Sequence, residues 1–167
     1  MTFKNTTALE DKALRGMVSH AVRCWRRDLV WRKNNKWRKP FRVADINAVE
    51  IRNRKFGTSG HAWGSPCWRI VVSVGLRGWH CREGCGPRWK DCGERSHVIW
   101  TPSTLAERIS SAAHLIAHEV GHLAVHWAED FHGRKWTRQN GKSSGGDEEF
   151  IDRMALQYRD EWLALQG

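Results

Sequence analysis

The sequence predicts a single α+β domain with an N-terminal helix, a small and mostly antiparallel sheet, a long second helix and a C-terminal helix. Apolar residues recur at helical spacing near both ends of the chain and again after residue 104. Between residues 48 and 100, β-branched and aromatic residues alternate with polar ones and are punctuated by glycines. With 167 residues, the chain can bury one core without disulfide bonds, so we expect residues 1–167 to form one domain.

Capping signals and apolar periodicity define the expected helices. Two of them begin with a capping box, in which a Thr precedes a Glu by three residues: Thr7 with Glu10, and Thr104 with Glu107. A third helix follows the Gly/Ser-rich residues 141–146, which we expect to form a linker. The expected helices cover residues 7–31 within a basic segment 7–42, residues 104–127, and residues 147–165.

The sheet region, residues 48–100, is expected to hold four short strands with an irregular excursion between the last two. The excursion runs from Gly78 to Arg95 and is rich in Cys and Gly. The expected strands are residues 49–56, 61–65, 67–75 and 97–100.

The second helix carries a pattern typical of a zinc site. His118 and His122 lie four residues apart, so their imidazoles project from one face of the helix and can share a tetrahedral Zn²⁺. Glu119 lies between them and can reach water beside the metal, which suits a general base. Gly121 leaves room for another element to approach the backbone closely. The pattern predicts one catalytic zinc ion.

A catalytic zinc needs a third protein ligand and one open position. His132 follows the expected end of the helix, where a turn could bring it under the metal. Glu148 begins the last helix, with Asp152 one turn later to orient a ligand histidine, although acidic residues at a helix N-terminus also oppose its dipole. His126 lies one turn beyond the histidine pair, and we expect it to have a structural or supporting role.

The motif at residues 118–122, followed by His132-Gly133-x-x-Trp136, resembles the SprT-like (Spartan-type) metallopeptidases over residues 48–136. The resemblance implies a zincin-like domain that cleaves DNA-associated proteins, with Glu119 as general base. We favour His132 over Glu148 because Gly133 and Trp136 have no other explanation. The zinc ligands that this resemblance implies are His118, His122 and His132.

A second resemblance links residues 118–126 and Glu148-x-x-x-Asp152-x-x-Ala155 to gluzincin peptidases of the ImmA/IrrE type. It implies Glu148 as third ligand and a transcriptional repressor as substrate. A further alternative is a nucleic-acid-binding module with a purely structural zinc, for which four protein ligands would be diagnostic.

In zincins of this kind, the substrate backbone pairs with a sheet edge near the metal. Trp68–Ser73 and Val98–Trp100 are the two segments that we expect to offer such an edge. The one tyrosine, Tyr158, is expected to face the apolar side of the last helix, which leaves the oxyanion stabiliser unassigned.

The chain is strongly basic, with 28 Lys and Arg against 18 Asp and Glu and a formal charge of +10. Such an excess suits a polyanionic partner, so we expect DNA as a partner in addition to a protein or peptide substrate. Tryptophans between the basic residues could stack on exposed bases. The expected nucleic-acid-binding residues are Arg23, Arg26, Arg27, Arg32, Lys33, Lys36, Arg38 and Lys39.

The five cysteines are an odd number, and the sequence shows neither an export signal nor an apolar run long enough for a membrane helix. We therefore expect a cytoplasmic protein with no membrane association and with free thiols. Cys81, Cys85 and Cys92 could hold a second, structural zinc, but their spacing lacks the paired Cys-x2-Cys knuckles of a zinc ribbon and only weakly indicates one.

Overall fold

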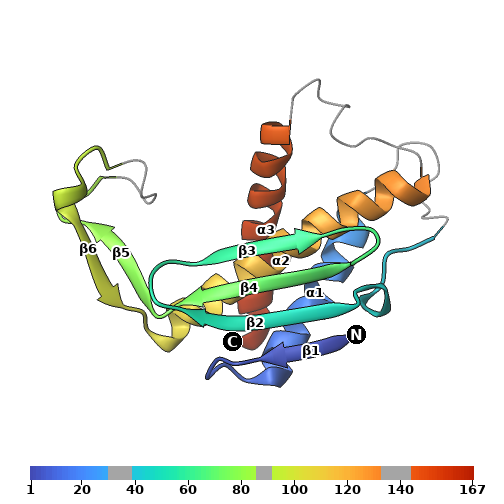
Figure 1. Ribbon diagram of the computed structural model, residues 1–167, viewed down its shortest axis with the longest axis horizontal. Coiled ribbons are helices and arrows are strands. Elements are labelled where there is room, and N and C mark those ends of the chain that lie inside the picture. Colours follow the sequence, from blue (N-terminus) through green and yellow to red (C-terminus); the bar gives the residue numbers. More distant parts are fainter. Residues whose placement is uncertain (30–38, 86–91, 133–143) are drawn as a thin grey trace.

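The computed structural model describes residues 1–29, 39–85, 92–132 and 144–167, without the side chains of residues 131–132 and 144–147. These parts form an α+β fold in which helices cover one face of a sheet (Figure 1). The helices are α1 (Asp11–Asp28), α2 (Leu105–His132) and α3 (Ser144–Gln166).

The main sheet has the strand order β1-β2-β4-β3. β1 and β2 are parallel, β2 and β4 are parallel, and only β3 runs antiparallel to its neighbour β4. The expectation of a mostly antiparallel sheet is therefore wrong for this sheet. The α1 crossover explains the parallel pair β1–β2, because a helical crossover returns the chain in the same direction. β2 and β4 are parallel because β3, which lies between them in sequence, runs antiparallel and pairs on the other side of β4. The strands are β1 (Thr2–Asn5), β2 (Ala48–Arg54), β3 (Ser59–Trp63) and β4 (Arg69–Gly75).

A second, two-stranded sheet projects from the body of the molecule (Figure 1). It pairs β5 (Arg77–Cys81) with β6 (Val98–Pro102) in antiparallel fashion, with Trp79 opposite Trp100. Part of the stretch that was expected to be irregular is thus a strand. Short 3-10 turns at Val43–Asp45 and Arg95–His97 precede β2 and β6.

The core lies between the sheet and α2, and between α2 and the other two helices. Gly121 makes the contact with α1 possible, because a Cβ at this position would run into the ring of Trp25 and the side chain of Ile151. The indole N–H of Trp25 donates a hydrogen bond of 2.8 Å to the carbonyl of Ala117. The close approach expected at Gly121 is therefore confirmed, and it fixes α2 against its neighbours.

The helix ends differ from the sequence expectations in several places, and α1 ends at Asp28, before the expected residue 31. Thr7 does not cap α1, since its hydroxyl accepts from the backbone N–H of Leu9 in a local turn, and α1 begins only at Asp11. The capping box at the start of α2 is confirmed by reciprocal bonds between Thr104 and Glu107 of 2.6 and 3.2 Å. At the other ends, α2 continues beyond residue 127 and α3 begins before residue 147. Within the described parts, none of the helices combines the length and apolar character needed to cross a bilayer.

Candidate metal centre

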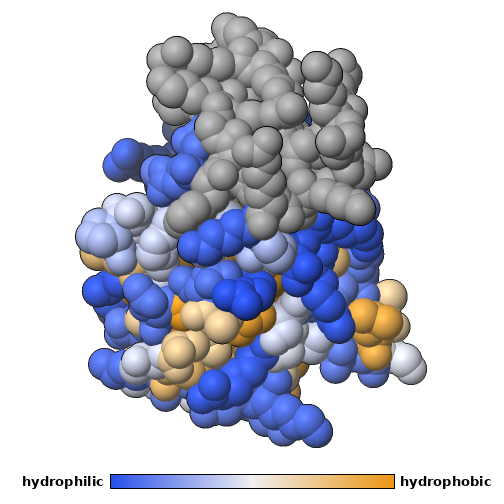
Figure 2. Space-filling model, turned by 90° about the vertical axis from the view of Figure 1, so that its right-hand side faces the viewer, coloured by the Kyte–Doolittle hydropathy of each residue, from blue (hydrophilic) through white to orange (hydrophobic). Residues whose placement is uncertain are grey.

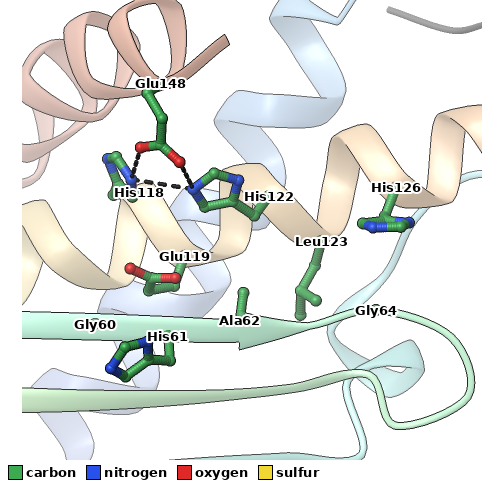
Figure 3. Close-up of a pocket in the computed structure, with 10 residues that line it drawn as sticks. All are labelled: Gly60, His61, Ala62, Gly64, His118, Glu119, His122, Leu123, His126 and Glu148. Carbon is green, nitrogen blue, oxygen red and sulfur yellow. Dashed lines mark hydrogen bonds and ion pairs between the residues drawn. The ribbon is translucent and has the colours of Figure 1, made fainter. Parts of the chain in front are cut away.

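Three side chains from two helices converge on one point (Figure 3). His118 and His122 project from α2, and Glu148 reaches them from the first turns of α3. The Nε2 atoms of the two histidines are 3.1 Å apart. One carboxylate oxygen of Glu148 lies 3.1 Å from Nε2 of His118, and the other lies 3.1 Å from Nε2 of His122.

These separations fit the donor set of a tetrahedral metal ion. Zinc binds imidazole nitrogen and carboxylate oxygen at ~2.0–2.2 Å, which places neighbouring tetrahedral ligands ~3.3–3.6 Å apart. The observed 3.1 Å distances are within a few tenths of an ångström of that edge. The three donors occupy one face of the tetrahedron and leave the fourth position free of these side chains. His118, His122 and Glu148 can therefore hold a divalent cation.

The acid between the two histidines faces the sheet. Figure 3 shows Glu119 turned from α2 towards Gly60 on β3. Glu119 is only 5% exposed. Its carboxylate makes no hydrogen bond or ion pair within the described parts of the chain. Burial, with a smaller contribution from the negative charge of Glu148, raises the pKa of Glu119 to about 8. Glu119 is therefore a buried carboxyl group that makes no hydrogen bond or ion pair with any other described side chain.

The raised pKa of Glu119 gives a stability prediction for the metal-free protein. A folded-state pKa of about 8, above the ordinary 4.5, means that the protonated form stabilises the fold below pH ~4.5 and that this stability is lost as the pH rises through 8. In urea unfolding with a chelator present, we expect the stability of Glu119→Gln relative to wild type to increase by roughly 2–4 kcal/mol from pH 4.5 to pH 9.

The matched control for this measurement is Glu149→Gln, at an exposed position on α3. Its stability difference from wild type should stay constant over the same pH range. Burial lowers the pKa of His114 and of His122, but both histidines are present in every variant, so their titration largely cancels in the differences. A pH-independent difference for Glu119→Gln would contradict this interpretation of the buried carboxylate.

A second acid on α3 lies behind the histidine pair. Asp152 is 2.8 Å from Nε2 of His114 and 3.4 Å from Nδ1 of His118. A carboxylate at Nδ1 fixes the tautomer and the ring orientation of a metal-ligating histidine. Sequence reasoning missed His114, although it lies on α2 four residues before His118, the spacing that singled out His118 and His122.

The helical geometry explains why the other histidines of α2 are not in this cluster. Each step of four residues turns about 40° around the axis and advances about 6 Å. His126 is therefore rotated away from the midpoint of the pair, and its exposed ring packs against Gly64. His132 is the last residue of α2, ten residues or about 15 Å along the axis from His122. Its side chain lies outside the described part of the structure.

A pocket of about 370 Å³ connects the metal cluster with the sheet. His118, His122 and Glu148 form one wall, Glu119 lies at its base, and Gly60–Ala62 of β3 form the opposite wall. β3 is an edge strand, since it pairs only with β4 in the described sheet. Tyr158 is fully buried elsewhere, and its hydroxyl donates to Asp28 at 2.9 Å.

The two segments expected to offer a substrate edge are not suited to that role. Trp68–Ser73 overlaps β4, which has β2 on one side and β3 on the other and has no free edge. Val98–Trp100 belongs to β6 in the separate sheet. The edge beside the metal cluster is β3, which the sequence pattern did not distinguish from its neighbours.

The basic segment is only partly described. Arg32, Lys33, Lys36 and Arg38 lie outside the described residues, while Arg23, Arg26 and Arg27 are exposed on α1. The guanidinium of Arg27 binds Asp28 and Glu161 at 2.7 and 3.1 Å, and the ammonium of Lys39 lies 5.0 Å from the ring centre of Trp127. Figure 2 shows a mostly hydrophilic surface, with small apolar areas, at this end of the molecule. DNA binding by this segment stays a prediction.

All five cysteines are free thiols, as expected. Cys81, Cys85 and Cys92 form a second group with donor atoms close enough to hold a metal ion. Another such group, His20, Cys24 and Glu161, lies between α1 and α3, with His20 and Cys24 buried and Glu161 partly exposed, and Arg27 also binds this acid.

Comparison of the chain with protein-family models, with curated proteins and with solved structures finds no match. The geometry of the residue groups that could hold a metal ion, and of the pocket, is therefore the basis for the functional proposals below.

Proposed function

We propose that the chain is a zinc-dependent peptidase in which His118, His122 and Glu148 hold the metal and Glu119 is the general base. The observation that carries this proposal is the convergence of three donor groups, whose nearest atoms are 3.1 Å apart in each pair, at the wall of a pocket that also contains a buried carboxylate. Three protein donors with one free position, beside a buried carboxylate at the wall of a pocket, are typical of catalytic zinc. This favours an enzyme over a binding module with a structural ion.

When bound, zinc supplies a Lewis acid that polarises a carbonyl group and makes water acidic near neutral pH. A nearby dication also favours the ionised form of Glu119, which opposes the effect of burial. Glu119 then accepts a proton as the water oxygen attacks the scissile carbonyl carbon. The same carboxyl group returns that proton to the amide nitrogen as the carbon–nitrogen bond breaks. The products are a free carboxylate and a free amine.

The unpaired edge of β3 supports a peptide as the substrate. An extended peptide can add to this edge through backbone hydrogen bonds, and its carbonyl would then lie between β3 and the metal cluster. Along β3, Gly60 lies against Glu119 and Ala62 packs on the core, while His61 is exposed. The small residues on the inner face leave room for the reacting groups.

Glu148 as third ligand supports the gluzincin resemblance over the SprT-like one. The carboxylate of Glu148, 3.1 Å from both imidazoles, and Asp152 one turn later, 3.4 Å from Nδ1 of His118, support the ligand assignment that the ImmA/IrrE resemblance implies. By the same resemblance, the substrate would be a transcriptional repressor. Cleavage of DNA-associated proteins, with His132 as ligand, is the alternative.

The experiment that tests the proposed function is cleavage of unfolded protein by the zinc-loaded chain. Casein and a mixed peptide library are incubated with the protein, and the products are identified by mass spectrometry. We expect internal cleavage that a chelator abolishes and that added zinc restores. If the protein holds zinc at the histidine pair and yet cleaves no peptide, the peptidase proposal is wrong.

Replacing Gly60 by alanine tests the position of the base. A Cβ at residue 60 would collide with the carboxylate of Glu119, lying 2.7 Å from its Cγ and Cδ. We expect Gly60→Ala to lower kcat by roughly 10-fold or more while zinc content is unchanged, because displacement of a reacting group by 1 Å can cost about 100-fold. Gly78→Ala is the matched control, since its Cβ would meet Ser103 at an ordinary 3.6 Å. Equal kcat for both variants would contradict the assigned position.

A further inference from the structure

The β5–β6 hairpin has little apolar packing to hold its far end in place. None of the described residues between Leu76 and Thr104 belongs to the buried core cluster of the domain. Near the body, Trp100 contacts Phe56, with ring centres 5.1 Å apart. The other end of the hairpin extends away from the sheet and helices (Figure 1). An isolated two-stranded hairpin is only marginally stable in water, so its far end needs another kind of cross-link.

Three thiols gather at that far end. Cys81 is the last residue of β5, and it pairs with Val98, the first residue of β6. The Sγ atoms of Cys81 and Cys92 are 3.5 Å apart, and Cys85 completes a group whose sulfur atoms all lie within 4.8 Å of one another. Four-coordinate zinc with Zn–S bonds of ~2.3 Å places neighbouring sulfur atoms ~3.8 Å apart. The cluster therefore has the dimensions of a thiolate metal site.

The backbone around the thiols is shaped to bring them together. The carbonyl of Cys81 accepts a hydrogen bond of 3.1 Å from the N–H of Gly84, which closes a tight turn. Gly84 has φ +71°, a left-handed conformation that glycine adopts without strain, and this returns the chain so that Cys85 faces Cys81. The N–H of Arg82 donates to the carbonyl of His97 at 2.8 Å, which continues the pairing of the two strands beyond Cys81.

We propose that Cys81, Cys85 and Cys92 supply three of the four ligands of a structural zinc ion that cross-links the far end of the β5–β6 hairpin. This site is separate from the histidine and glutamate cluster on α2 and α3. A disulfide explains the arrangement less well, because three equivalent thiols would leave one unpaired, and all three are free. Soft thiolate ligands select zinc over magnesium or calcium.

The first test measures zinc content per chain after purification without chelator. Wild type should hold two zinc ions, and the triple variant Cys81→Ser/Cys85→Ser/Cys92→Ser should hold one. The double variant His118→Ala/His122→Ala should also hold one, with X-ray absorption showing three sulfur neighbours at ~2.3 Å. Cys67→Ser, at an exposed cysteine outside the cluster, should keep both ions. A double variant without zinc, or with zinc free of sulfur ligands, would overturn the proposal.

The zinc content of the variants tests the two sites separately. If the histidine cluster holds no metal, wild type carries one zinc that only the cysteine variant loses, which supports this inference and contradicts the proposed function. If the cysteines hold none, wild type carries one zinc that only the histidine variant loses.

A second test uses the wild-type chain alone and does not depend on the folding of a variant. Alkylation of each thiol is followed by mass spectrometry with zinc bound and after chelation. We expect zinc to slow modification of Cys81, Cys85 and Cys92 by 10-fold or more, while the rate at Cys67 is unchanged. Equal rates with and without zinc at the three cysteines, or a Cys81–Cys92 disulfide in the purified protein, would contradict the site.

Discussion

Replacing Glu119 by glutamine is expected to leave zinc bound at His118 and His122 and to lower kcat by roughly 10²–10⁴-fold, the usual contribution of a general base. Glutamine keeps the size of the buried side chain but cannot accept the proton of the attacking water. The measurement is kcat on the best peptide found, together with zinc content per chain. Because Glu119 does not join the metal cluster, metal binding and turnover should separate in this variant.

The matched control is Glu129→Gln, at a partly buried acid farther along α2 and outside the pocket lining. It should retain wild-type kcat. Turnover by Glu119→Gln within about threefold of wild type, at full zinc occupancy, would exclude the proposed base.

Replacing Glu148 by glutamine is expected to remove most of the zinc from the histidine cluster and, with it, the activity. A neutral amide replaces the carboxylate that lies 3.1 Å from both imidazoles, so the site loses its only negative ligand. We expect the metal Kd to rise by at least 10- to 100-fold, a change known even for substitutions in the shell around metal ligands. The Kd is measured by competition with a fluorescent zinc chelator.

Two variants make this result specific. Glu149→Gln changes the neighbouring exposed acid and should leave the Kd unchanged. His132→Ala should also leave it unchanged if Glu148 is the third ligand. The opposite pattern, with affinity lost in His132→Ala and retained in Glu148→Gln, would favour the SprT-like assignment.

The proximity of the two histidines of the candidate metal centre could be predicted from the sequence because its geometry is local. Four-residue spacing on a helix places His118 and His122 on one face whatever the rest of the chain does. The same local rule could have identified His114. It could not decide between His132 and Glu148 as third ligand, because the approach of Glu148 to the histidine pair depends on how α3 packs against α2.

In the sheet, the positions of most strands could be predicted from local sequence patterns, whereas the order of the strands could not. β2, β3, β4 and β6 were expected at about the right positions from alternation and glycine punctuation. β1 is four residues long with a single large apolar side chain, Phe3, so it carries too little periodicity to be recognised. Which strand forms the edge at the metal depends on strand order, which rests on pairings between residues far apart in the chain.

Glycine positions illustrate why the site could not be completed from sequence. Gly121 was expected to allow a close contact because it lies inside the motif. Gly60 is as important for the position of Glu119, yet in the sequence it is one of several glycines between residues 57 and 78. Its role becomes visible only when β3 lies over α2.

The most direct test of the central claim is a crystal structure of the zinc-loaded protein with anomalous diffraction recorded at the zinc absorption edge. We expect an anomalous peak between α2 and α3, with Nε2 of His118, Nε2 of His122 and a carboxylate oxygen of Glu148 each at ~2.0–2.2 Å. A peak in that place with His132 as the third ligand, or no peak at the histidine pair, would contradict the account.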